Sequence, residues 1–446
     1  MSGLEVGAVS ILAMLVLIYI GMYVPIVLAF ISFVGVWVVK GNVNIAVSLL
    51  WIASAKTVGN FLFGVIPLFV LMGLLVSACG MGRDTYDIAQ SLVKRIRGGL
   101  GMATVVANAI FAAITGVSIA SATVFTRISV PEMLRYGYKG RFAVGVVAGS
   151  SVLGMLIPPS VLLIIYALIA EESVGDLFIA GVGPGLLLTA AFCGLIAFMA
   201  YVFPNSVASP ETFAQESESE TRISRKELVS KSWPIATLIL VVLGGIYAGF
   251  YTPTEAGAAG AFVAFLFALS RRSLTWRSTW VILVEAGHIS ATLLFLIVSA
   301  SMYSRMLGIT GLPTQLGTWI GEMDASFGML LFLYVVIVLV LGTIIDSVSI
   351  MLISVPLFLV VLAPFNVDLV WFGIVTIIAT EIGLLTPPLG LAVYVIKSTL
   401  DRDDISLADI FIGAAPFALT MLFVLIAIIL VPEISLYLVE LRRSFL

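Results

Sequence analysis

The chain has 446 residues, of which 61% are hydrophobic and 11% are charged, with a mean hydropathy of +1.19 and a net charge of −3. Soluble domains carry about 25% charged residues, so this composition excludes a soluble globular protein and predicts a polytopic helical membrane protein. One histidine and two cysteines are too few ligands for a zinc or iron centre. The sequence also has no phosphate-binding loop, nucleophile elbow or basic nucleic-acid segment, so we expect neither an enzyme nor a nucleic-acid-binding protein.

The chain begins with three predicted membrane spans. Residues 7–39 form an almost unbroken apolar run, which we divide into two helices near Pro25 because proline ends or kinks a helix. Residues 40–56 are interpreted as a connection, and residues 58–78 as the third span. Residues 83–97 then predict an amphipathic helix that lies on the membrane surface. Its apolar stripe consists of Ile88, Leu92 and Ile96.

Residues 98–133 form an apolar stretch with a polar, glycine-containing break at residues 115–118. Each arm has about 15 residues, fewer than the roughly 20 that a single crossing needs. We therefore predict a re-entrant hairpin, whose polar tip must line a protein cavity because bare backbone is not tolerated in lipid. Residues 142–168 follow as a helix broken at Gly154 and Pro158-Pro159, and residues 184–203 cross back.

The second half repeats this order after a polar segment, residues 204–231, which predicts a disordered cytoplasmic linker with acidic repeats at Glu216, Glu218 and Glu220. The predicted elements are spans at 234–250, 255–269 and 286–307, an interfacial segment at 271–280, a hairpin at 327–362, a broken helix at 371–396 and a last span at 411–431.

The two halves also share local sequence. Laying Pro158-Pro159 on Pro387-Pro388 places Gly154 on Gly383, and laying Pro131 on Pro356 places Ser121 on Asp346. Paired, interrupted apolar segments at matching places in two halves indicate a transporter binding site. The predicted fold is therefore an all-helical membrane protein with two inverted repeats, residues 1–203 and 232–446. Each repeat has three spans, a re-entrant hairpin, a broken helix and a final span.

Basic residues are unevenly divided between the two faces of this topology. Sixteen lie on one face and five on the other, namely Lys40, Lys56, Arg305, Arg442 and Arg443. The positive-inside rule makes the face with sixteen cytoplasmic, so the first hairpin enters from the cytoplasm, the second enters from outside, and both chain ends lie outside.

Several motifs, taken in order, resemble the large membrane subunit of tripartite ATP-independent periplasmic (TRAP) transporters, the DctM/SiaM type. They are AAITGVSIASA at 112–122 with PEM at 131–133, LIPPS at 156–160, FYTPTEAGA at 250–258, GTIIDS at 342–347 and GLLTPP at 383–388. In the first hairpin, Val117 and Ser121 depart from the residues that family members often have, Ser and an Asp or Thr.

The resemblance implies an elevator-type transporter of a bacterial or archaeal inner membrane, driven by a sodium gradient. It also implies two partners: a small four-helix membrane subunit, here a separate chain, and a soluble periplasmic binding protein that delivers an organic acid such as a C4-dicarboxylate or sialic acid. No cofactor is expected beyond the coupling sodium ions. The alternatives are a stand-alone anion transporter of the same architecture, a channel, or a membrane-embedded enzyme.

Sodium prefers oxygen ligands, which a hairpin tip facing a Pro-Pro break can supply from hydroxyls and freed carbonyls. We predict a first sodium site from Thr115, Gly116, Ser118, Ser121, Gly154 and Pro158, which leans on backbone carbonyls because Val117 has no side-chain oxygen. A second site is predicted from Gly342, Asp346, Ser347, Glu381, Gly383 and Thr386. The alternative is that these small residues only allow close helix packing.

Asp346 is the sharpest of these predictions, because an ionised carboxylate at a helix centre costs about 2.5–3.5 kcal/mol in a membrane. No Lys or Arg lies near it in the sequence, so a bound cation would compensate its charge; a protonated or water-facing carboxyl is the alternative. Glu381 shares this argument more weakly. Glu255 is predicted to cap its helix, and His288 is expected to make a structural hydrogen bond rather than relay protons.

The predicted substrate is anionic, since half-helices beginning at Ser160 and Leu389 direct their positive ends toward the centre of the membrane. The candidate substrate-binding residues are Arg127, Ser150, Ser151, Ser160 and Thr380. For the hydroxyl residues, packing or capping is the alternative role. For Arg127 the favoured alternative is an arginine that extends its side chain to the membrane surface or forms an ion pair.

Overall fold

The structure is a computed structural model that describes residues 2–93, 96–208, 224–322, 326–388 and 390–445. Within these ranges the regular structure is helical, and the only β-type pairing is an isolated bridge between Tyr138 and Ala208. Seven described helices are long and apolar enough to cross a membrane, or eight if the bent pair Gly140–Leu156 and Val161–Ala170 is one span. The prediction of an all-helical polytopic membrane protein is confirmed.

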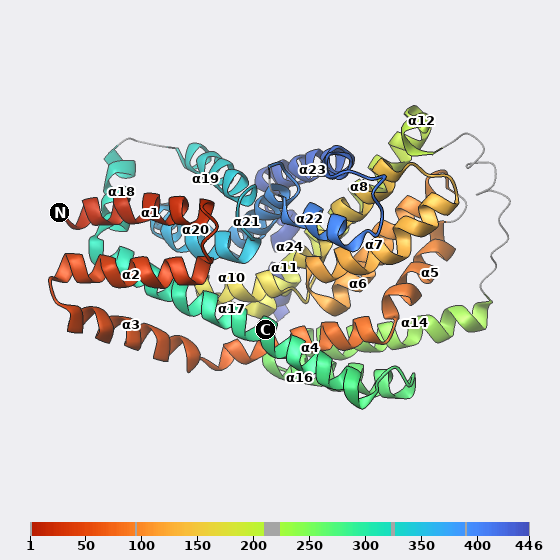
Figure 1. Ribbon diagram of the computed structural model, residues 1–446, viewed down its shortest axis with the longest axis horizontal. Coiled ribbons are helices and arrows are strands. Elements are labelled where there is room, and N and C mark those ends of the chain that lie inside the picture. The colour runs from red at the N-terminus through yellow and green to blue at the C-terminus, as the bar shows by residue number, and fades with distance from the viewer. Residues whose placement is uncertain (1, 94–95, 209–223, 323–325, 389, 446) are drawn as a thin grey trace.

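The first half of the chain contains two helices, a helix pair, a short arm, a hairpin, a broken helix and a long helix (Figure 1). They are α1 (Gly3–Tyr19), α2 (Val24–Lys40), α3 (Val43–Val58), η1 (Phe61–Gly64), α4 (Val65–Ala78), α5 (Met81–Val93), α6 (Gly99–Thr115), α7 (Ser118–Arg135), α8 (Gly140–Ser151), α9 (Leu153–Leu156), α10 (Val161–Ala170), α11 (Val174–Val202) and the short α12 (Pro204–Val207).

The second half follows a matching order. Its elements are α14 (Arg225–Ile239), η2 (Leu240–Gly244), α15 (Gly245–Tyr247), α16 (Pro253–Ser270), α17 (Trp276–Thr310), α18 (Leu312–Glu322), α19 (Phe327–Gly342), α20 (Ser347–Leu362), η3 (Ala363–Phe365), α21 (Leu369–Leu384), α22 (Leu391–Thr399), α23 (Leu407–Leu430) and α24 (Glu433–Phe445). In this order α17 corresponds to α3 plus α4, and α18 corresponds to the arm α5.

The two halves pack against each other through reciprocal pairs of helices. Helix α2 packs on α17, and α4 packs on α16, which are the same pair of positions with the halves exchanged. The second part of each broken helix also crosses over, because α10 packs on α20 and α22 packs on α7. In Figure 1 the hairpin α6/α7 and the hairpin α19/α20 accordingly lie on opposite sides of a central group that contains α10, α11 and α21.

Residues 43–58 form the helix α3, so the prediction of a connection over residues 40–56 is wrong. The Asn42 side chain caps this helix by accepting a hydrogen bond of 2.8 Å from the backbone N–H of Asn44. One side of α3 is buried, with Ala46, Leu50, Ala53 and Thr57 at helical spacing. Helix α3 packs on α2 and α17, as expected for a helix with one buried side.

Helix α17 is continuous over 35 residues, which corrects the prediction of an interfacial segment at 271–280 followed by a separate span. Thr275 caps its beginning in a reciprocal pair of hydrogen bonds with Ser278. At about 1.5 Å per residue, α17 is about 52 Å long. It runs diagonally across the molecule from α18 to the neighbourhood of α16 (Figure 1).

Helix α5 is amphipathic as predicted, but it ends at Val93, and residues 94 and 95 lie outside the described residues. Its protein-facing side carries Met81, Thr85 and Ala89, which are buried against α6 and α14. In the predicted apolar stripe, Leu92 is 68% exposed and Ile96 is 42% exposed. Ile88, the first residue of the stripe, is half-buried and packs against the core, so only the later part of the stripe faces away from the protein.

Two helices begin earlier than predicted. Helix α11 starts at Val174, ten residues before Pro184, where the Ser173 hydroxyl accepts a hydrogen bond from the N–H of Asp176. Helix α14 starts at Arg225, within the segment predicted as a disordered linker. Both helices contain a proline that sequence reasoning took as a boundary, yet membrane helices tolerate proline when neighbours satisfy the freed carbonyl. Residues 209–223, with the acidic repeats, lie outside the described residues.

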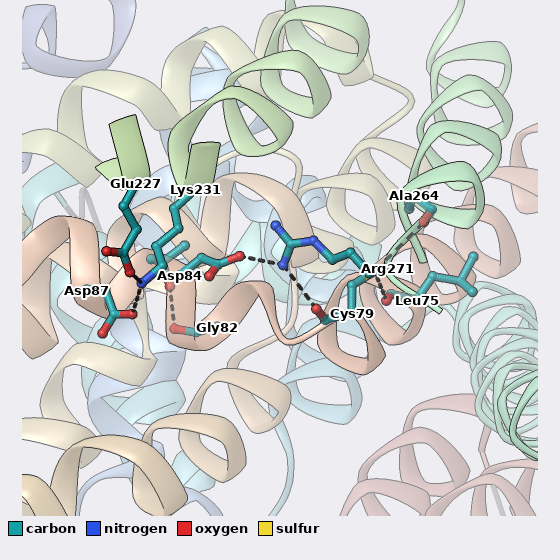
Figure 2. A network of polar contacts seen from close by, with 10 residues as sticks. Leu75, Cys79, Gly82, Asp84, Asp87, Glu227, Lys231, Ala264 and Arg271 are labelled. Atoms are coloured by element: carbon teal, nitrogen blue, oxygen red, sulfur yellow. Dashed lines mark hydrogen bonds and ion pairs between the residues drawn. The ribbon is translucent and has the colours of Figure 1, made fainter. Parts of the chain in front are cut away.

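A cluster of charged side chains joins α5 to the second half (Figure 2). The Nζ of Lys231 in α14 lies 2.8 Å from Oδ2 of Asp87 and 2.7 Å from Oε1 of Glu227. Arg271, which follows α16, donates to Asp84 at 2.5 Å and to the carbonyl oxygen of Cys79 at 3.1 Å. Because Lys231 and Arg271 are less than a third exposed, these contacts hold α5 firmly against α14 and α16.

Candidate transport site

The tip of the first hairpin rests on the Pro-Pro break of its own half. The backbone N–H of Val161 donates to the carbonyl oxygen of Gly116 at 3.1 Å. Gly116 has φ +69°, and a Cβ on it would clash with the carbonyl oxygen of Pro159. Only glycine adopts this conformation at so close an approach without strain. Gly116 is thus brought against the break through Pro159 and Val161. The Pro158-Pro159 peptide bond is cis.

The hydroxyls of this first tip are buried. Ser118 is 5% exposed and Ser121 is fully buried, and the Ser121 hydroxyl has no hydrogen-bond partner among the described residues. The backbone of Ser118 packs on Gly154, whose added Cβ would lie 3.0 Å from the Ser118 Cα. Thr115 turns its hydroxyl back to the carbonyl oxygen of Phe111 at 2.8 Å. Two of the predicted residues of site one, Ser118 and Gly154, are therefore in contact, and Gly116 reaches the break through Pro159.

The tip of the second hairpin is built differently, because Asp346 caps α20. One carboxylate oxygen accepts hydrogen bonds of 3.0 Å from the backbone N–H groups of Val348 and Ser349, and the other accepts from the Ser349 hydroxyl. These contacts, at the positive end of a helix, compensate the negative charge of Asp346. The negative charge of Asp346 therefore does not require the bound cation that the sequence alone had suggested.

Glu381 is a buried carboxylate with little compensation from the residues that the structure describes. It is 2% exposed, and the Ser347 hydroxyl donates to its Oε1 at 2.9 Å. No ion pair to Glu381 is present among the described residues. A buried carboxylate with one neutral partner is costly, so this position favours a cation.

The remaining predicted residues of site two lie at the same junction. Gly342 and Gly383 bring the backbones of α19 and α21 into contact, since a Cβ on Gly342 would lie 2.6 Å from the Gly383 Cα. Thr386 is half-buried and donates its hydroxyl to the carbonyl oxygen of Ile382 at 2.8 Å. The Pro387-Pro388 peptide bond that follows is also cis.

Four predicted substrate-binding hydroxyls are fully buried, and each donates to a backbone carbonyl. The acceptors of Ser150, Ser151, Ser160 and Thr380 are Val146, Ala148, Met155 and Thr376, at 2.5–2.8 Å. A hydroxyl whose proton is engaged presents only lone pairs to a further partner. Ser150 also accepts a hydrogen bond from Asn108, and Ser160 caps α10 by accepting one from the N–H of Leu163, so these hydroxyls are poor donors to a substrate carboxylate. Leu389, the predicted start of a half-helix, lies outside the described residues, and α22 begins at Leu391.

Arg127 is not brought to this junction. It lies on the exposed side of α7, nine residues after Ser118, or about 14 Å along the helix axis. Sequence reasoning also missed Asn108, a fully buried amide whose Nδ2 donates to Ser150 at 2.7 Å while its Oδ1 has no partner among the described residues. Asn108 could have been found from the sequence, because it is a single amide within the apolar run of α6, two turns before Thr115.

The caps correct the internal alignment. The N-cap of α7 is Val117 and that of α20 is Asp346, and the prolines follow after 14 and 10 residues respectively, from 131 − 117 and 356 − 346. Laying Pro131 on Pro356, which placed Ser121 on Asp346, is therefore wrong by about one helical turn at the tips. Asp346 corresponds to Val117, and the first tip has no carboxylate at its cap.

The sequence matches a known protein family over nearly its whole length. The family model described as "Tripartite ATP-independent periplasmic transporter, DctM component" matches residues 11–434, nearly the whole chain. The chain belongs to the DctM family. As a DctM protein with seven or more apolar helices, it is a multi-pass inner-membrane protein and the large permease subunit of a TRAP transporter.

Relatives with assigned names share this family. The C4-dicarboxylate TRAP transporter large permease protein DctM of Pseudomonas aeruginosa is 33% identical over 372 residues, covering 83% of this chain and 84% of the relative. The sialic acid TRAP transporter large permease protein SiaM of Vibrio cholerae is 31% identical, covering 87% and 88%. The 2,3-diketo-L-gulonate TRAP transporter large permease protein YiaN of Escherichia coli is 28% identical, covering 83% and 84%.

A solved structure shares the DctM fold at low sequence similarity. The YdaH transporter of Alcanivorax borkumensis aligns with a TM-score of 0.57 over 83% of this chain and 85% of its own, at 14% identity. At this identity the likeness concerns the fold alone.

The predicted role of Glu255 as a helix cap is confirmed. Its carboxylate and the Thr252 hydroxyl form a capping box at the start of α16.

Proposed function

We propose that this DctM protein is the transport subunit of a sodium-coupled, binding-protein-dependent secondary transporter that imports an organic acid. The observation that carries this is the packing of each hairpin tip on the broken helix of its own half, at Gly116 with Pro159 and at Gly342 with Gly383. The relatives named for C4-dicarboxylates, sialic acid and 2,3-diketo-L-gulonate support an organic acid as the substrate class.

The chemistry at both junctions supports sodium as the coupling ion. Glu381 is a buried carboxylate without an ion pair among the described residues, and Ser121 has a buried, unpartnered oxygen. A small hard cation takes oxygen ligands of these kinds. Site one would use Thr115, Gly116, Ser118, Ser121, Gly154 and Pro158, and site two would use Gly342, Asp346, Ser347, Glu381, Gly383 and Thr386.

An elevator motion is the mechanism we propose. The hairpins and broken helices, α6–α10 and α19–α22, would move as one body because α10 packs on α20 and α22 packs on α7. The reciprocal pairs α2–α17 and α4–α16 would form the fixed frame. Sodium and substrate binding at the tips would then be coupled, because each ligand stabilises the same closed arrangement of tip and break.

Two partners complete the proposal: a separate small four-helix membrane subunit and a soluble periplasmic binding protein. The orientation we propose has both chain ends outside, on the face with five basic residues. The binding protein would deliver the acid to this face. A stand-alone transporter of the same architecture would need no such delivery.

Reconstitution in vesicles tests the proposal. The chain with its cognate small subunit would be assayed for uptake of succinate, sialic acid and 2,3-diketo-L-gulonate, with and without the cognate binding protein. We expect uptake of one acid, dependent on both the binding protein and an inward sodium gradient, and abolished when potassium or lithium replaces sodium. Uptake of free acid without the binding protein would favour the stand-alone transporter, and full activity in potassium would exclude sodium coupling.

A further inference from the structure

A polar cavity lies away from the hairpin tips, between the proposed frame and the proposed moving body. It has a volume of about 300 Å³. One wall comes from the end of α3 and from α17, and the other from the end of α10 and from α20. The cavity thus borders the broken helix of the first half and the hairpin of the second.

Two basic side chains line this cavity. Lys56 comes from α3 and Arg305 from α17, 249 positions later in the chain. Neither makes a hydrogen bond or an ion pair with any residue that the structure describes. By contrast, Arg442 and Arg443, which share the same predicted face, are both paired with Asp176. Two unpaired cations from distant segments therefore meet at one hollow.

The rest of the lining suits a small acid. Ser301 and Ser304 lie three residues apart on α17 beside Arg305, so hydroxyl donors and a guanidinium lie along one side of the helix. Leu352 and Pro356 of α20 supply an apolar wall. The volume is at the lower end of the range for small-molecule sites, about 300–1,000 Å³.

One acidic residue in the lining of this cavity would repel a bound anion. Glu171 also lines the cavity and lies at the end of α10, on the proposed moving body. It has no ion pair with Lys56 or Arg305 in this structure. The lining therefore has a net charge of +1, and Glu171 competes with a carboxylate for the two cations.

We propose that this cavity is an entry site that holds the carboxylate of the organic acid between its release from the binding protein and its arrival at the hairpin tips. Lys56 and Arg305 attract the carboxylate, and Ser301 and Ser304 donate hydrogen bonds to it. Opposite charges raise the local concentration of a charged ligand and its rate of association. This inference rests on the proposed function, because it presumes an anionic substrate that arrives from the face carrying Lys56 and Arg305.

Charged thiol reagents test the potential of the cavity without knowledge of the substrate. In a Ser304→Cys variant in vesicles, an anionic methanethiosulfonate should react faster than its cationic trimethylammonium analogue. Adding Lys56→Gln and Arg305→Gln should lower this rate ratio about tenfold, whereas Glu171→Gln should raise it. Lys40→Gln is the matched control, because Lys40 is exposed on the same predicted face but does not line the cavity. If the ratio of the two reaction rates does not change when Lys56 and Arg305 are replaced, the inference is overturned.

Uptake kinetics test the role in transport. With the acid that the reconstitution identifies, Lys56→Gln and Arg305→Gln should each raise KM several-fold with little change in kcat, and Glu171→Gln should lower KM. An unchanged KM in active, sodium-dependent vesicles would refute the entry site but leave the proposed function intact. Protection of Ser304→Cys by phosphatidylglycerol, but not by the acid, would mean that a lipid phosphate occupies the cavity and would also refute it.

Discussion

The two hairpin tips have similar positions but different chemistry. At the first tip, Gly116 contacts Pro159 through backbone atoms, the cap residue is Val117, and both prolines of the break are buried. At the second tip, Asp346 caps the helix, Glu381 lies buried beside Ser347, and both prolines of the break are exposed.

If both tips bind sodium as proposed, one architecture would hold an ion in two ways. The first tip offers neutral oxygens from hydroxyls and peptide carbonyls in a closed environment. The second offers two carboxylates in a more open one. Because a carboxylate binds a cation more strongly than a carbonyl does, we expect the second site to set the sodium affinity and the first to depend on tight packing.

The largest expected effect is at Gly116. Gly116→Ala places a Cβ against Pro159 in a left-handed conformation, which costs about 1–2 kcal/mol, and crowding adds about 1–3 kcal/mol. Thermal unfolding of the purified protein should show a total loss of roughly 3 kcal/mol, with loss of uptake. Gly342→Ala should cost less, because Gly342 does not have a positive φ.

Gly194→Ala is the control for this comparison, since Gly194 lies in α11 with no atom within 4 Å of an added Cβ. It should leave stability unchanged or raise it by up to about 1 kcal/mol. A Gly116→Ala protein as stable as the Gly194→Ala protein would mean that the first tip does not rest on its break.

Asp346→Asn should have the next largest effect. Asparagine is as good a cap as aspartate, so expression and stability should be retained. The loss of a charge beside the proposed second sodium site should weaken sodium affinity about tenfold, or about 1.4 kcal/mol. Uptake measured against sodium concentration checks this, and an unchanged sodium dependence would remove Asp346 from the site.

Ser121→Ala should have the smallest effect. Its hydroxyl is buried without a partner among the described residues, so its removal should leave stability unchanged or improve it slightly. If it binds sodium at the first site, sodium affinity should fall only a few-fold. Ser151→Ala is a useful contrast, because it breaks a hydrogen bond of 2.8 Å to Ala148 and should cost about 1 kcal/mol in stability. A Ser121→Ala protein with unaltered sodium affinity would argue against a ligand role.

Much of the fold could be predicted because apolar length and helix-breaking residues act locally. The breaks at Gly116 and at both Pro-Pro pairs, and the cap at Thr252, follow from backbone geometry that short sequences dictate. The predicted helix boundaries were wrong where tertiary packing overrides a local sequence signal. Pro184 and Pro234 lie inside helices, and α17 continues through a segment that charge alone suggested was interfacial.

The candidate site could be predicted as a set of segments but not as a set of contacts. Sequence showed that Asp346 has no basic neighbour, but only the structure shows that the start of α20 satisfies it. Likewise, the engagement of Ser150 by both Val146 and Asn108 depends on the rotation of α6 against α8. Lys56 and Arg305 are 249 positions apart, and no local pattern announces that they line one cavity.

The reciprocal pairing of α2 with α17 and α4 with α16 has a consequence for how such a chain can evolve. Helices of each half pack on helices of the other, and the ion pairs of Lys231 and Arg271 add further contacts between the halves. Doubling the length of the connecting segment would cost only about 0.6 kcal/mol, because loop-closure entropy grows slowly with length. Genes for such proteins are therefore free to lengthen this junction while the two halves keep their contacts.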